Sequence, residues 1–65
     1  MLVRVNGAAR ELAPGTTLAE LMGSVPQERG VAAALDGEVV PRGTWPQTEL
    51  SDGARVEVVV AVQGG

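Results

Sequence analysis

The chain has 65 residues and a net charge of −3 at pH 7, with five arginines and no lysine. A chain of this length can bury one small core, which limits it to a single domain of modest stability. It contains no cysteine and no histidine, which excludes disulfides, thiolate nucleophiles and the usual transition-metal ligands. We therefore expect no catalytic residue in this chain, and no metal or cofactor bound by the chain itself.

The charge balance also bears on partners. Proteins that bind a phosphate backbone rely on clustered basic residues, which a lysine-free acidic chain does not provide. No apolar run approaches the roughly 18 residues that a membrane span needs, and no charged leader precedes a long hydrophobic block. We expect no nucleic-acid or membrane partner, and a cytoplasmic protein.

The first 12 residues predict a β-hairpin. Alternate positions from Met1 to Val5 are apolar, which is the period of a half-buried strand. Asn6 and Gly7 follow, and this pair favours the type I′ turn, whose two central positions both need positive φ. A short return strand is expected over residues 8–12.

A short helix is predicted next. Thr17 and Glu20 have the spacing of a capping box, in which each side chain satisfies the other's main-chain amide. Gly23 and Pro26 end the helix after about two turns. Its apolar face is expected to pack on a sheet, because so short a helix is not stable alone. That face consists of Leu18, Leu21 and Met22.

A second hairpin is predicted around Asp36 and Gly37. The nearly continuous apolar run over residues 31–35 indicates a strand covered on at least part of both faces, and residues 38–40 form the return strand. Residues 41–50 are expected to be irregular, because the two prolines in this segment cannot donate ladder hydrogen bonds.

Trp45, the only aromatic residue, lies in this irregular segment. The simpler interpretation is a lid packed over one end of the core. The alternative is a partner-facing anchor, since exposed tryptophan often serves interfaces.

The strongest strand signal covers residues 55–62, where valines at alternate positions form one apolar face. The opposite face also carries apolar residues, which would be exposed in so small a protein. We interpret them, together with same-face positions of the first strand, as a surface for docking a partner. The predicted docking residues are Val59, Ala61, Leu2 and Arg4.

The chain ends in Gly64 and Gly65. Glycine has no Cβ, so this end can enter a narrow enzyme channel and adopt whatever backbone angles the bound geometry requires. The terminal carboxylate is ionised at neutral pH and becomes an electrophile only when another enzyme activates it, for instance by adenylation. The Gly65 carboxylate is the predicted chemical site, and Gly64 gives access to it.

The order of predicted elements is two strands, a helix, two strands and a last long strand. A two-layer α+β domain, with the helix covering one face of the sheet, is the compact solution. The order of the strands within the sheet is not determined by the sequence. If the last strand lies parallel to the first, the connection between them must carry the helix over one face.

Several of these segments together resemble the ThiS family, the sulfur carrier proteins of bacterial thiamine biosynthesis. They are Asn6-Gly7, the segment Asp36-Gly-Glu-Val-Val-Pro-Arg42, Trp45, Asp52-Gly53 and the ending Ala61-Val62-Gln63-Gly64-Gly65. One departure is Asp36-Gly37, where family members often have Asn-Gly, and it preserves the turn. The resemblance implies a ubiquitin-like β-grasp fold, with a mixed sheet of four to five strands packed on one short helix. Residues 1–62 would form this domain and residues 63–65 a flexible tail.

The resemblance also implies a chemistry. An E1-like adenylyltransferase of the ThiF type would use ATP and Mg²⁺ to convert the Gly65 carboxylate to an acyl-adenylate. Sulfur from a cysteine desulfurase would then give a thiocarboxylate, and a thiazole synthase of the ThiG type would take that sulfur into the thiazole ring. Gly65 would carry the sulfur covalently.

Three other readings remain open at this point. The small subunit of molybdopterin synthase also ends in Gly-Gly and carries sulfur, although such subunits are generally longer and richer in aromatic residues. A ubiquitin-like protein modifier would join Gly65 to a lysine of a target protein. A binding module of β-grasp type would leave both glycines idle.

Overall fold

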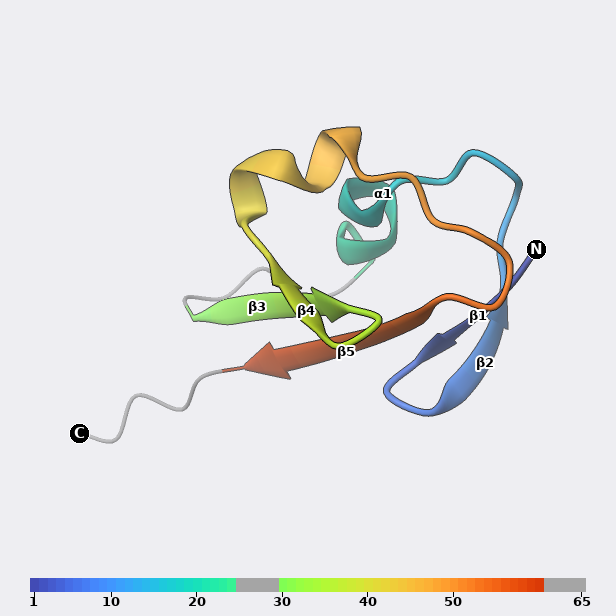
Figure 1. The fold of residues 1–65 in the computed structure, drawn as a ribbon, viewed down its shortest axis with the longest axis horizontal. Coiled ribbons are helices and arrows are strands. Elements are labelled where there is room, and N and C mark those ends of the chain that lie inside the picture. The colour runs from blue at the N-terminus through green and yellow to red at the C-terminus, as the bar shows by residue number, and fades with distance from the viewer. Residues whose placement is uncertain (25–29, 61–65) are drawn as a thin grey trace.

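The computed structural model describes residues 1–24 and 30–60, and these residues form one sheet with two short helices (Figure 1). The elements in chain order are β1 (Leu2–Val5), β2 (Ala8–Glu11), α1 (Leu18–Met22), β3 (Val31–Leu35), β4 (Glu38–Val40), the 3₁₀ helix η1 (Arg42–Gln47) and β5 (Arg55–Val60). Among the described residues, no helix reaches the length and hydrophobicity that a membrane span requires.

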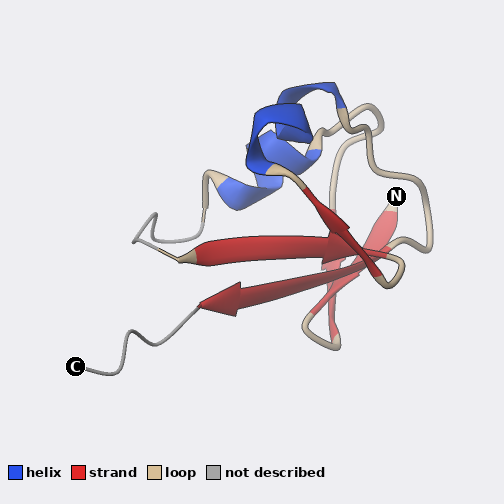
Figure 2. Cartoon of the chain, turned by 60° about the vertical axis from the view of Figure 1, so that its left-hand side comes forward, coloured by secondary structure: helices blue, strands red, loops and turns tan. Residues whose placement is uncertain are grey.

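The sheet has five strands in the order β2-β1-β5-β3-β4. Its central pair, β1 and β5, is parallel, with Arg4 opposite Arg55. The outer strands are antiparallel hairpin partners, and β3 pairs with β5 from Val31 opposite Val60 to Leu35 opposite Val56. The parallel pair requires a crossover, and α1 and η1 both lie on the same side of the sheet (Figure 2). The expected mixed sheet and two-layer α+β arrangement are confirmed.

Both predicted hairpin turns are present, and their central residues have the positive φ values on which the prediction was based. Asn6 and Gly7 have φ values of 49° and 84°, and Asp36 and Gly37 have 49° and 89°. Positive φ at both central positions matches the right-handed twist of the flanking strands, and Asn, Asp and Gly are the residues that tolerate it.

The predicted capping box begins α1. The Glu20 amide donates to Thr17 Oγ1 at 3.2 Å, and the Thr17 amide donates to Glu20 Oε1 at 2.9 Å. The predicted apolar face is buried in the core. The buried residues that form this core are Val3, Leu18, Leu21, Met22, Val31, Ala33, Trp45, Leu50, Ala54 and Val56.

One local expectation was wrong. Residues 41–50 are not irregular throughout, because Arg42–Gln47 form the 3₁₀ helix η1. The amide of Thr44 donates to the Pro41 carbonyl at 2.9 Å, and Pro41 stands just before the helix, where its missing N–H costs no intrahelical bond. Strand β3 is covered more fully on the helix side, where Val31 and Ala33 are buried, than on the opposite face, where Ala32 is exposed and Ala34 is half-buried.

Trp45 closes the core on the helix side of the sheet. Only 4% of its surface is exposed, and its Nε1 donates to the Val40 carbonyl at 2.9 Å. A buried indole needs such an acceptor, which the end of β4 provides. The interpretation of Trp45 as a lid over the core is confirmed.

Candidate functional site

The predicted chemical site lies outside the described residues. Gly64, Gly65 and the docking candidate Ala61 fall in residues 61–65, as does the domain boundary expected after residue 62. What the structure describes is the base from which this segment continues, namely β5 up to Val60. Strand β5 is the central strand of the sheet and has a neighbour on each side.

Two turn residues bind β5 through their side chains as well as their main chains. On the β1 side, Asn6 Oδ1 accepts from the Val58 amide at 2.8 Å, and Asn6 Nδ2 donates to the Val58 carbonyl at 3.3 Å. On the β3 side, Asp36 Oδ1 accepts from the Arg55 amide at 3.0 Å, and the Asp36 amide donates to the Arg55 carbonyl at 2.8 Å. The turns therefore hold β5 near its start and near its end, which makes it a rigid base for the chain beyond it.

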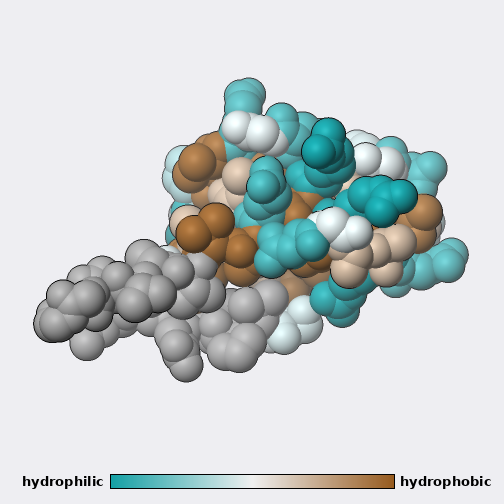
Figure 3. All heavy atoms as spheres, turned by 90° about the horizontal axis from the view of Figure 1, so that it is seen from below, coloured by the Kyte–Doolittle hydropathy of each residue, from teal (hydrophilic) through white to brown (hydrophobic). Residues whose placement is uncertain are grey.

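The face of the sheet opposite the helices carries apolar residues close to the end of β5. Val59 is 58% exposed, and it pairs with Ala32 on β3. Two positions along β3, Ala34 pairs with Val39, which is 75% exposed. Because paired residues share a face, these four side chains form one apolar area, which we call the valine patch. Figure 3, which views the molecule from the side away from the helices, shows apolar and polar residues interspersed there.

The structure divides the predicted docking surface. Leu2, 47% exposed, and Arg4 lie on the same face as Val59, as strand alternation predicted. However, Arg4 is level with Arg55, so Leu2 lies six strand positions from Val59, a separation of about 20 Å along the strands. Val39 was missed by the sequence reasoning, because its place on this face follows from its pairing with Ala34.

Charged residues lie between these two ends of the open face. Arg4 and Arg55 are direct neighbours in the parallel pair, and Glu57 follows two positions along β5. Arg4 Nη1 donates to the Gly7 carbonyl at 3.4 Å. Within residues 1–24 and 30–60, no three acidic side chains lie close enough to hold a metal ion. The described part of this face offers binding groups without a nucleophile paired to a base.

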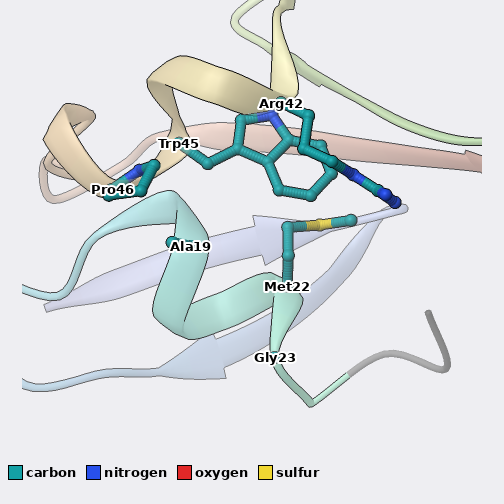
Figure 4. A pocket seen from close by; sticks show the side chains of 6 residues that line it. All are labelled: Ala19, Met22, Gly23, Arg42, Trp45 and Pro46. Carbon is teal, nitrogen blue, oxygen red and sulfur yellow. The ribbon is translucent and has the colours of Figure 1, made fainter.

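A pocket of about 310 Å³ opens on the helix side of the sheet (Figure 4). Its lining residues are Ala19, Met22, Gly23, Arg42, Trp45 and Pro46. The Arg42 guanidinium lies 5.3 Å from the centre of the Trp45 ring, which is within the range of a cation–π interaction. Met22 reaches toward the indole from α1 (Figure 4). The pocket lies where α1 packs against η1, and Arg42 is the only charged residue in the described part of its lining. This lining supplies no general acid or base.

The fold and sequence closely match known proteins. In the solved structures, the crystal structure of a thiamine biosynthesis protein (ThiS) from Geobacter metallireducens superposes with a TM-score of 0.86 at 32% identity, covering 100% of both chains. The NMR solution structure of a thiamine biosynthesis protein from Geobacter metallireducens gives a TM-score of 0.77 at 29% identity, covering 100% of this chain and 88% of the other. The ubiquitin-like β-grasp fold expected from the sequence is confirmed.

Curated relatives point to the same family. The chain is 32% identical over 66 aligned positions to the sulfur carrier protein ThiS of Escherichia coli (strain K12), with 100% of both proteins covered. It is 30% identical to a thiazole synthase of Paramagnetospirillum magneticum (strain ATCC 700264 / AMB-1), of which it covers 20%. The ThiS family model matches residues 3–65. The chain therefore belongs to the ThiS family.

Proposed function

We propose that this protein is a sulfur carrier of thiamine biosynthesis and that sulfur is attached to the carboxyl group of Gly65. The observation that carries the proposal is the family match, which runs from residue 3 to residue 65 and so includes the Gly-Gly end. The similarity to the sulfur carrier protein ThiS over the full length of both chains supports the same assignment.

Two partner-catalysed steps produce the carrier's reactive form. The Gly65 carboxylate attacks the α-phosphate of ATP held with Mg²⁺ on an E1-like adenylyltransferase, and pyrophosphate leaves. In the second step, the outer sulfur of a persulfide from a cysteine desulfurase attacks the acyl carbon, AMP leaves, and a partner thiol then attacks the inner sulfur of the resulting acyl disulfide, so that a disulfide forms and the Gly65 thiocarboxylate is released. A carboxylate oxygen is a poor leaving group whereas AMP is a good one, so activation must come first. The thiocarboxylate product is nucleophilic enough to pass its sulfur on.

Thiazole synthase is the proposed acceptor of this sulfur. Support comes from the Paramagnetospirillum thiazole synthase, because a fifth of that protein is similar to the whole of this chain. A carrier-like segment within the same polypeptide as the synthase fits a direct transfer between the two. The carrier itself is not an enzyme in this proposal. It acts in the cytoplasm, where the adenylating enzyme uses ATP and the cysteine desulfurase supplies the sulfur.

The valine patch is the proposed docking surface for these partners. Val59 and Val39 expose large parts of their side chains, and β5 leads from this patch toward Gly65. A partner that covers the patch would gain the free energy of burying apolar surface. This placement favours Val59 over Leu2 as the centre of the docking surface.

A growth experiment tests the proposal. The full chain and a chain lacking Gly64 and Gly65 are expressed in a bacterial strain that lacks its own sulfur carrier of thiamine biosynthesis. We expect growth without thiamine for the full chain only. Circular dichroism should show that both chains are folded. Growth of the shortened chain would contradict the carrier role, and detection of Gly65 in an isopeptide bond with a target lysine would favour a protein modifier.

A further inference from the structure

The side chain of Asn6 continues the hydrogen-bond ladder between β1 and β5 beyond the end of β1. The Arg4 amide donates to the Ala54 carbonyl, and the Asn6 amide donates to the Val56 carbonyl, both at 2.9 Å. At Val58, the next position of the ladder, the main chain of β1 has already turned into the hairpin. The side-chain amide takes its place, with Oδ1 accepting from the Val58 amide and Nδ2 donating to its carbonyl.

This contact lies close to the point where β5 leads into the chain end. Val58 is seven residues before Gly65, and β3 supports the opposite edge of β5 as far as the pair of Val31 and Val60. Among the described residues, Asn6 makes the β1-side contact nearest the end of β5. Near its end, β5 is therefore held by Asn6 on one edge and by β3 on the other.

We propose that Asn6 is a positioning residue for adenylation of Gly65, acting through its hold on Val58 in β5. The inference rests on the proposed sulfur-carrier function and names a residue that acts through β5 without touching the reacting atoms. Misplacing a reacting group by about 1 Å lowers the rate of a step strongly even when binding is unchanged. Loosening Val58 should therefore affect turnover more than docking.

Asparagine meets two requirements at this position. Its φ of 49° is tolerated by Asn, Asp and Gly far better than by other residues. Of these three, only Asn offers both an acceptor and a donor that reproduce a peptide group. Asp would keep the acceptor and place a carboxylate against the Val58 carbonyl, and Gly would keep the turn while losing both bonds.

Asp36 provides a matched control within the same chain. It occupies the equivalent position of the other hairpin, has the same φ of 49°, and accepts from a β5 amide through its side chain. Its contact, however, is at Arg55, at the start of β5. Asp36→Gly therefore removes one side-chain hydrogen bond at the start of β5, whereas Asn6→Gly removes two nearer its end.

The test compares Asn6→Gly, Asn6→Asp and Asp36→Gly with the wild-type chain in adenylation assays using the partner adenylyltransferase, ATP and Mg²⁺. Amide hydrogen exchange at Val58 is followed in parallel. For Asn6→Gly we expect exchange at Val58 to accelerate, kcat to fall about tenfold and KM to stay within about twofold. The kcat of Asn6→Asp should lie between that of Asn6→Gly and that of the wild type. Asp36→Gly should keep the wild-type kcat.

Each outcome has a distinct meaning. An equal fall in kcat for Asn6→Gly and Asp36→Gly would overturn the positioning role and leave a structural one. Wild-type kcat in Asn6→Gly would also overturn it, whatever the exchange at Val58. If the wild-type chain is never adenylated by a competent enzyme, the proposed function fails, and the role of Asn6 in that function fails with it.

Discussion

Val39 and Val59 lie on either side of β3 on the open face of the sheet, and the alanines with which they pair, Ala34 and Ala32, lie between them. The two valines come from strands that are not neighbours in the sheet. Their exposure places both side chains outside the core, and it is the basis on which we propose the valine patch as a docking surface.

We predict that replacing Val59 with serine weakens binding to the adenylating enzyme. Burying most of a valine side chain contributes about 1.5 kcal/mol or more, so loss of that contact should raise KM about tenfold. Val39→Ser should act in the same direction. The measurement is the steady-state KM of the carrier in adenylation.

Leu2→Ser is the matched control for the docking prediction. Leu2 is apolar, exposed and on the same face, but about 20 Å along the strands from Val59. We expect its KM to stay within about twofold of the wild-type value. A rise in KM as large as that of Val59→Ser would move the docking surface toward β1.

The capping box of α1 should contribute measurably to stability. Thr17→Ala removes the acceptor of the Glu20 amide and should lower the free energy of unfolding by about 1 kcal/mol. For a domain of this size that corresponds to a fall in Tm of about 4–8 °C. Thermal unfolding followed by circular dichroism measures it. Thr17→Ser keeps the hydroxyl, so an equal loss in that variant would show that the cap is not the cause.

Replacing Trp45 should lower the free energy of unfolding by more than its position in a segment expected to be irregular suggests. Trp45→Phe removes the Nε1 hydrogen bond to the Val40 carbonyl and creates a small void, and we expect a loss of about 1–3 kcal/mol in the free energy of unfolding. Trp45→Ala should cost about 3–5 kcal/mol and leave so small a domain largely unfolded. Urea denaturation followed by circular dichroism gives both values. A near-neutral Trp45→Ala would contradict the role of the indole in the core.

Local signals in the sequence predicted the local structure well. The two turns around Gly7 and Gly37 and the start of α1 at Thr17 depend on residues within a few positions of one another, and all three are found. The 3₁₀ helix η1 was missed because Pro41 and Pro46 were considered only for their inability to donate ladder hydrogen bonds, which argues against a strand but not against a short 3₁₀ helix.

Long-range features could not be predicted from local patterns. The parallel pairing of Arg4 with Arg55 joins positions about fifty residues apart, and the position of Leu2 far from Val59 follows from that register. The side-chain contact between Asn6 and Val58 depends on the same register. From the sequence, Asn6 was fully explained as a turn residue, so nothing indicated its second role.

The most direct test of the sulfur-carrier function is the intact mass of the protein after incubation with ATP, Mg²⁺, the adenylating enzyme and a cysteine desulfurase with cysteine. We predict a mass increase equal to the replacement of one oxygen by sulfur, located at Gly65 by fragmentation. An unchanged mass, with the same enzymes shown to modify another carrier, would contradict the proposed function.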